Sequence, residues 1–136
     1  MRSVACAIIV TTGVVGVIGS ALGADMTGAE LKAFLSDKTT YLEATAASAS
    51  GTAGQGIIYW AADGTALYKT PAGPIFHGKW EIKGNTNCAD WRERPGTGCV
   101  RYDKTGDVVT VIDVATGQAR AKVMKTAPGN AEKLAP

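Results

Sequence analysis

The sequence predicts a mostly β fold: a small antiparallel barrel or sandwich of six to seven strands, with one N-terminal amphipathic helix and one disulfide. Three observations predict it. From residue 57 onward, short β-prone stretches alternate with turn residues. An Asp-Gly pair at residues 63–64 separates two such stretches, which is a strong hairpin signal. Cys88 and Cys99 flank a further turn and can join its two strands.

The first 24 residues have the layout of a secretory signal peptide. Arg2 supplies a positive charge, an apolar run follows over residues 4–18, and small residues precede position 25. We therefore expect residues 1–24 to be removed, which leaves residues 25–136 as a single β-rich domain. An uncleaved membrane anchor is the alternative, because about 20 apolar residues suffice to cross a bilayer. In that case the leader would be the link to a membrane.

Charge and cysteine content limit the compartments and partners that we expect for this protein. The chain has 14 basic and 12 acidic residues, and this near-neutral balance argues against a nucleic-acid partner. Cys6 would leave with the leader, and it precedes most of the apolar run, whereas a lipidated cysteine would follow the run. Cys88 and Cys99 remain. An even pair in an exported chain predicts a disulfide and a periplasmic or secreted location.

A helix start is evident near the beginning of the mature chain. Thr27 can accept a hydrogen bond from the amide of Glu30, and Met26 can pack on Leu31. The apolar positions that follow fall on one face at helical spacing. This pattern predicts a short helix over about residues 28–37 that docks on the sheet.

Small residues dominate the next tract, residues 44–56, which reads ATAASASGTAGQG. It contains no large apolar side chain that could be buried, and its composition is typical of a flexible Gly/Ala/Ser loop. No Gly-Lys-Ser or Gly-Lys-Thr ending follows it, so the tract does not match a phosphate-binding loop.

The first predicted hairpin turns at residues 63–64. With a two-residue loop, Trp60 lies opposite Leu67. The same register places Tyr59 opposite Tyr68, so that both faces of the hairpin carry apolar or aromatic side chains.

The second predicted hairpin follows from the cysteines. Directly opposed residues on antiparallel strands have Cα atoms about 4.5 to 5.5 Å apart, which a disulfide tolerates. If Cys88 opposes Cys99, then Trp91 shares a face with Val100 and Tyr102. The disulfide would stabilise the fold by about 3 kcal/mol on the chain-entropy account. Further strands are expected at residues 79–83, 108–114 and 120–124.

The sequence offers no set of residues that fixes a reaction. His77 is the one histidine, so a Ser-His-Asp triad cannot be argued, and a zinc site would need cysteines already assigned to the disulfide. We therefore expect a non-enzymatic protein with no cofactor and no metal. His77 is interpreted as an ordinary residue at a strand edge.

Two groups of residues are candidates for binding. Aromatic side chains on neighbouring strands would form an apolar pocket if the interior is hollow, and would fill the core if it is not. The six aromatic candidates are Tyr59, Trp60, Tyr68, Trp80, Trp91 and Tyr102. The tip of the cysteine hairpin is the other candidate, as a charged partner-binding loop formed by Arg92, Glu93 and Arg94.

Short features in a fixed order cover nearly all of the mature chain: MTGAELKAFLSDKT, YWAADGTA, HGKW, NCADW, GCVRY and PGNAEKL. Together they resemble the uncharacterised exported proteobacterial family called domain of unknown function 995. The resemblance implies a secreted or periplasmic β-rich domain, and it supplies no activity and no catalytic residue. The HGKW segment is also similar to the Gly-x-Trp of lipocalin-like barrels, although it lies in the middle of this chain.

These predictions lead to a non-enzymatic periplasmic or secreted binding module, whose partner is an unknown protein or a small apolar molecule. A lipocalin-like carrier of small apolar ligands is one alternative. An inhibitor of a cell-wall hydrolase is another, and it rests on analogy with other exported β domains of this size.

Overall fold

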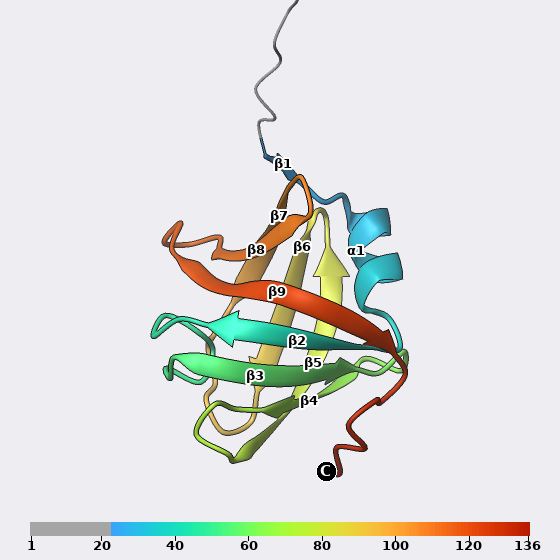
Figure 1. The fold of residues 1–136 in the computed structure, drawn as a ribbon, viewed down its shortest axis with the longest axis vertical. Coiled ribbons are helices and arrows are strands. Elements are labelled where there is room, and N and C mark those ends of the chain that lie inside the picture. The colour runs from blue at the N-terminus through green and yellow to red at the C-terminus, as the bar shows by residue number, and fades with distance from the viewer. Residues whose placement is uncertain (1–22) are drawn as a thin grey trace, which may run out of the picture.

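The computed structural model describes residues 23–136 and confirms a mostly β fold, built as a closed antiparallel barrel (Figure 1). Apart from positions 23 and 24, the predicted signal peptide lies outside the described residues. The elements in chain order are β1 (Ala24–Asp25), α1 (Gly28–Leu35), β2 (Lys38–Ala44), β3 (Gly54–Trp60), β4 (Thr65–Lys69), β5 (Ile75–Lys83), β6 (Thr86–Trp91), β7 (Cys99–Thr105), β8 (Val108–Asp113) and β9 (Ala119–Pro128).

Strands β2 to β9 form the barrel with an up-and-down topology. Each strand pairs antiparallel with the next one in the sequence, and β9 returns to pair with β2, which closes the ring. The short β1 adds to β7, where Asp25 lies opposite Asp103. A barrel is thus the correct member of the predicted pair of architectures.

The pairing between β6 and β7 is the shortest contact in the ring, and we call it the seam. Its register contains two residue pairs, Asn87 with Val100 and Cys88 with Cys99. The predicted disulfide is confirmed here, with directly opposed cysteines whose Cα atoms are 4.0 Å apart. The predicted parity also holds, because Trp91, Val100 and Tyr102 are buried inside the barrel. A covalent bond therefore closes the ring where few hydrogen bonds do.

Helix α1 seals one end of the barrel, which we call the helix end. It packs against β2, β5 and β6, beside the points where β2 begins and β5 ends (Figure 1). Its Leu31 and Leu35 are completely buried. Thr27 accepts the predicted hydrogen bond from the Glu30 amide, at 3.2 Å. The helix ends at Leu35 rather than near residue 37, because Asp37 adopts a positive φ of 55° and turns the chain directly into β2.

Strand β2 was missed by the sequence analysis, and the barrel therefore has eight strands rather than six to seven. Its pattern is obscured by two buried threonines. Thr39 donates to the carbonyl of Gly129 at 2.6 Å and accepts from the amide of Ala131 at 3.0 Å. Thr40 accepts from Trp60 Nε1 at 3.0 Å. Because these hydroxyls have partners, polar residues occupy positions where a pattern search expects apolar ones.

The predicted register of the first hairpin is wrong by one residue. Trp60 lies opposite Ala66, and Tyr68 lies opposite Ile58. The loop has three residues instead of two, because Gly64 adopts φ of 93° and the Ala61 amide donates to the Thr65 carbonyl at 2.9 Å. As a result, Trp60 and Tyr68 both point into the barrel.

At the other end of the barrel, four connections lie together, and we call this the loop end. They are residues 45–53, 70–74, 92–98 and 114–118. The predicted flexible tract over residues 44–56 falls partly here, with its first residue in β2 and its last three in β3. Within it Ser48 is buried and donates to the Thr52 carbonyl at 3.0 Å.

Candidate functional site

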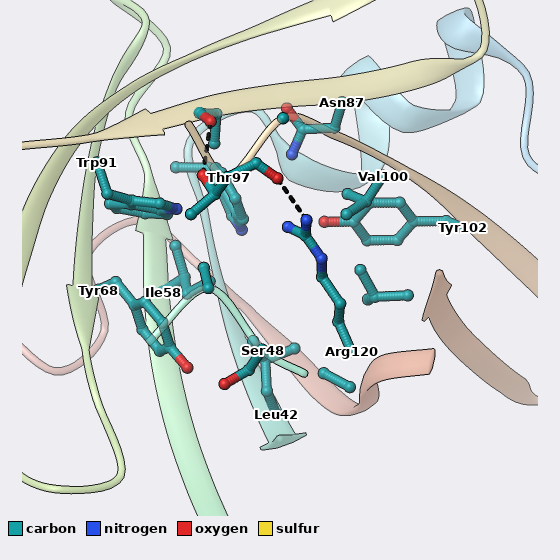
Figure 2. Close-up of a pocket in the computed structure, with 16 residues that line it drawn as sticks. Leu42, Ser48, Ile58, Tyr68, Asn87, Trp91, Thr97, Val100, Tyr102 and Arg120 are labelled. Atoms are coloured by element: carbon teal, nitrogen blue, oxygen red, sulfur yellow. Dashed lines mark hydrogen bonds between the residues drawn. The ribbon is translucent and has the colours of Figure 1, made fainter. Parts of the chain in front are cut away.

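The barrel encloses a pocket of about 50 Å³ that reaches the loop end. Inward-facing residues of the strands form most of its wall. Ser48 and Ala49 of the loop 45–53 complete it, together with Thr97 and Gly98 of the loop 92–98 (Figure 2). The loops contribute small side chains to the wall at the loop end. These side chains therefore do not fill the interior of the barrel.

Four of the six candidate aromatic residues line this pocket: Trp60, Tyr68, Trp91 and Tyr102. The Trp91 ring lies 6.1 Å from that of Trp60 and 5.5 Å from that of Tyr68, so three rings form one continuous surface. Tyr102 contributes a hydroxyl near Asn87 and Arg120 (Figure 2).

Inward-facing glycines make room for these rings. A Cβ atom at Gly78 would lie 2.6 Å from the ring of Trp91, and one at Gly56 would lie 2.8 Å from the ring of Tyr68. Gly78 belongs to the HGKW segment, so its glycine has a steric reason in this barrel. Replacing Gly78 or Gly56 by alanine would therefore push the neighbouring ring toward the pocket.

The other two aromatic candidates do not reach the pocket. Trp80 packs edge-on against Trp60, with ring centroids 5.6 Å apart, and its Nε1 donates to the Ala61 carbonyl at 2.9 Å. Tyr59 points to the outer face, where its hydroxyl donates to Asp37 at 2.9 Å. The sequence analysis offered six rings as candidates for the pocket, and the structure brings four of them to one cavity.

An ion pair that the sequence analysis did not single out lies at the pocket. Arg120 Nε donates to Asp113 Oδ2 at 2.9 Å, and its Nη2 contacts the same carboxylate. Nη2 also donates to the Thr97 carbonyl (Figure 2). Both side chains are mostly buried, with 13% and 15% of their surface exposed. Burial alone would raise the pKa of Asp113, but the bonds from Arg120 and from two backbone amides outweigh burial and lower it.

A β-bulge explains why Arg120 faces inward. Val111 pairs with Ala121, while the next residue, Ile112, pairs with Ala119, so Arg120 is the extra residue. A bulge re-aims the side chain that it inserts. No residue in the run ARAKV marks this change in the sequence, since strict alternation would place Arg120 on the outer face with Lys122.

Asn87 is the second polar residue that the sequence analysis missed. It lies on β6 directly before Cys88, and it is 1% exposed. Neither its Nδ2 nor its Oδ1 has a hydrogen-bond partner among the described residues. Leaving such a buried group unsatisfied costs about 1 to 3 kcal/mol. The inward parity of β6 could have located Asn87, but its lack of a partner depends on side chains from other strands.

Tyr102 stands next to these groups and keeps its proton at neutral pH. Burial raises the pKa of its hydroxyl to about 12, and the Asn87 side chain, which is close enough to donate toward the phenolate, opposes this shift only in part. No hydrogen bond of normal geometry joins the two side chains. The pocket therefore presents a neutral phenol, an amide and a guanidinium.

The charged tip of the cysteine hairpin is held against the barrel by His77. Glu93 accepts from the His77 amide at 2.7 Å and contacts His77 Nδ1 at 2.5 Å, while the Arg92 amide donates to the His77 carbonyl at 2.8 Å. Burial acts to raise the pKa of Glu93, but the bonds from His77 outweigh it, and the net pKa is lowered. Arg94 crosses over Gly51, where a Cβ atom would lie 2.0 Å from its Nη1.

Comparisons with protein-family models, with curated proteins and with solved structures give no match for this chain. Within residues 23–136, no helix is long and apolar enough to cross a membrane. The same residues contain no group of three or more histidine, cysteine or acidic side chains placed to hold a metal ion.

Proposed function

We propose that this protein is a non-enzymatic binding module that is periplasmic or secreted. Its ligand site is the pocket inside the barrel. The observation that carries the proposal is Asn87, whose buried amide lacks a partner while facing a cavity that reaches the loop end. Natural cores satisfy nearly all buried polar groups, so an exception at a pocket points to a ligand.

The groups around the pocket are suited to holding a molecule. Tyr102, with a pKa of about 12, is a poor base or acid near neutral pH. Arg120 supplies N–H donors in a rigid planar fork. His77 makes its contacts with Glu93, away from the residues that line the pocket. Hydrogen bonds and aromatic contact are therefore what the site offers.

Export is supported by the disulfide together with the predicted leader. Cys88 and Cys99 close the ring at its shortest pairing, so an oxidising compartment would preserve the barrel that forms the pocket. A periplasmic or secreted location remains a prediction, as does the resemblance to domain of unknown function 995.

The size of the pocket favours a small ligand or one end of a larger one. Pockets for drug-sized molecules typically measure about 300 to 1,000 Å³, whereas this one measures about 50 Å³. A lipocalin-like carrier would need a wider interior, which makes that alternative less well supported than a site for a few atoms.

A protein partner is the second candidate, and a hollow on the outside of the loop end favours it. Loops 45–53, 92–98 and 114–118 line this hollow together, with Arg94 and Pro95 at its surface. Inhibition of a cell-wall hydrolase belongs to this class of function.

Native mass spectrometry tests the main proposal. The full chain with its leader would be expressed in a Gram-negative host and purified from the periplasm without denaturation. We expect a bound small molecule that is released on unfolding and does not return after refolding in pure buffer. Asn87→Leu should lose the bound molecule, and Gln55→Leu, which removes an exposed amide from the outer face of β3, should retain it. A wild-type protein of bare mass in every preparation would count against the pocket as the site.

A further inference from the structure

We infer that the pocket takes the carboxylate of a short-chain organic acid, bound between Arg120 and Asn87. The inference rests on the proposed function and names the class of ligand. Its first support is the donor character of the one ionic side chain in the lining. Arg120 is the one charged residue among the described residues that line the pocket, and no acidic side chain faces the cavity with it. Asp113 balances the charge of Arg120, so the preference of this lining for an acceptor such as a carboxylate rests on the N–H groups of Arg120 that Asp113 leaves free.

Asp113 does not remove this preference, because of where it binds. It occupies Nε and Nη2 of Arg120, and the Thr97 carbonyl shares Nη2. Nη1 has no partner among residues 23–136, so two of the five N–H groups stay free for another acceptor. Arg120 lines both the pocket and the outer hollow, whereas Asp113 lines the outer hollow and not the pocket.

Asn87 supplies a second free donor beside the guanidinium. Figure 2 shows its amide nitrogen on the same side of the pocket as Arg120, and the Tyr102 hydroxyl near Asn87 belongs to the same lining. Nδ2 can donate to one carboxylate oxygen while Arg120 donates to the other, and charge-assisted bonds of this kind are the stronger ones. Since Tyr102 keeps its proton, its hydroxyl adds a donor and brings no negative charge.

The remaining wall suits an alkyl group. Leu42, Ile58 and Val111 line the pocket together with the Trp60 ring. A hydrated inorganic anion such as phosphate would lose water without gaining partners on this side, whereas an alkyl chain would gain contact.

The volume of the pocket sets the length of the acid. One water molecule requires roughly 10 to 15 Å³ in this measure, and the pocket has about 50 Å³. It can therefore accept about four non-hydrogen atoms, which corresponds to acetate or to the carboxylate end of a longer acid that leaves through the loop end.

The test is a titration of the folded wild-type protein followed by NMR, with the side-chain amide of Asn87 and the Nε–H of Arg120 as reporters. Acetate and propionate should shift both signals with saturation. Propionate should also give nuclear Overhauser contacts from its alkyl protons to the methyl groups of Leu42 and Ile58. Ethylammonium, 1-propanol and inorganic phosphate are the matched probes of other charge or shape, and they should leave both reporters unchanged.

Variants separate the site from the fold. Asn87→Leu should weaken propionate binding at least tenfold, which we would measure on the Arg120 signal. Gln55→Leu should bind propionate as the wild type does. The Overhauser contacts in the wild type test whether propionate binds in the pocket, and this test does not depend on whether a variant folds.

Three results would overturn the inference: equal shifts with ethylammonium or propanol, a phosphate response without a carboxylate response, or unchanged propionate binding in a folded Asn87→Leu protein. A co-purified molecule that lacks a carboxylate would remove this ligand class and leave the binding function in place. No co-purified molecule and no response of the Asn87 amide to any probe would overturn both proposals.

Discussion

The two ends of the barrel are built on opposite principles. At the helix end, Leu31 and Leu35 are completely buried, and the exposed amide of Gly28 is satisfied by Asn85 Oδ1 at 2.9 Å. At the loop end, the covering residues are small, and the pocket behind them extends through the barrel to Asn87 near the start of β6, which is buried without a partner among the described residues. One end therefore contributes to stability through apolar contact, while the other keeps a polar cavity that costs stability.

This division separates where the fold is stabilised from where a ligand can bind. The loop end lies next to the seam, in which the Cys88–Cys99 disulfide replaces a long run of strand pairing. The helix end is tied to β7 by the ring contact of Phe34 with Tyr102, at 6.3 Å between centroids. Substitutions at the two ends should therefore differ in sign as well as in size.

The largest effect is expected from Leu35→Ala at the helix end. It removes a completely buried side chain and leaves a cavity under α1, which typically costs about 2 to 5 kcal/mol. Urea unfolding followed by tryptophan fluorescence would measure the loss. The control is Leu67→Ala on the half-buried outer face of β4, where a smaller loss is expected. Equal losses in both variants would contradict the idea that the helix end dominates stability.

Loss of the disulfide comes next and should act on the seam. Replacing both Cys88 and Cys99 by alanine should lower stability by about 3 kcal/mol, because the unfolded chain regains freedom and the ring loses its closure. Hydrogen exchange should rise in β6 and β7 more than in β2 and β3, since the latter pair through a long register. Uniform exchange across all strands would show that the seam is no weaker than the rest.

At the pocket, Asn87→Leu should change stability in the opposite direction. The variant replaces an unsatisfied buried amide with an apolar side chain of similar volume, which should raise the free energy of unfolding by about 1 kcal/mol or more. That corresponds to a gain of about 4 °C or more in Tm for a domain of this size. A lower Tm than that of the wild type would show that Asn87 is satisfied in solution and that the two ends are not opposites.

Local patterns predicted the parts of the fold that depend on neighbouring residues. The helix cap at Thr27, the pairing of Cys88 with Cys99 and the inward parity of Trp91 all follow from spacings within a few residues or one hairpin. Strand β2 could not be found in this way, because its buried Thr39 and Thr40 depend on partners from the C-terminal segment and β3.

The candidate site was predictable only in part, because its residues are brought together by pairing between strands. The sequence identified Trp60, Tyr68 and Trp91 as aromatic residues on neighbouring strands that could line one pocket. The register of the first hairpin was off by one, so which of the six rings share the cavity was not evident. Arg120 points into the pocket because of the bulge between β8 and β9, and a bulge cannot be predicted from the pattern of one strand alone. Asn87 stands out only once the surrounding side chains are placed.

The smallest effect on stability is expected from Glu93→Gln at the tip of the cysteine hairpin, and the size of this effect should depend on pH. The bonds from His77 lower the pKa of Glu93 in the folded state, so the carboxylate stabilises the fold above the ordinary glutamate pKa, and this contribution is lost as the pH falls through the lowered folded value. Because the pair is partly exposed, the difference between wild type and Glu93→Gln at neutral pH should be below about 1 kcal/mol.

Unfolding titrations of both proteins from pH 7 down to about pH 3 would measure this difference, which should shrink in acid. Glu81→Gln is the control, because Glu81 pairs with Lys83 on an exposed face and should show little effect. A Glu93→Gln difference that stays constant with pH would mean that the carboxylate charge does not hold the tip. In that case the loop end would depend on the disulfide and on the small residues that cover the pocket.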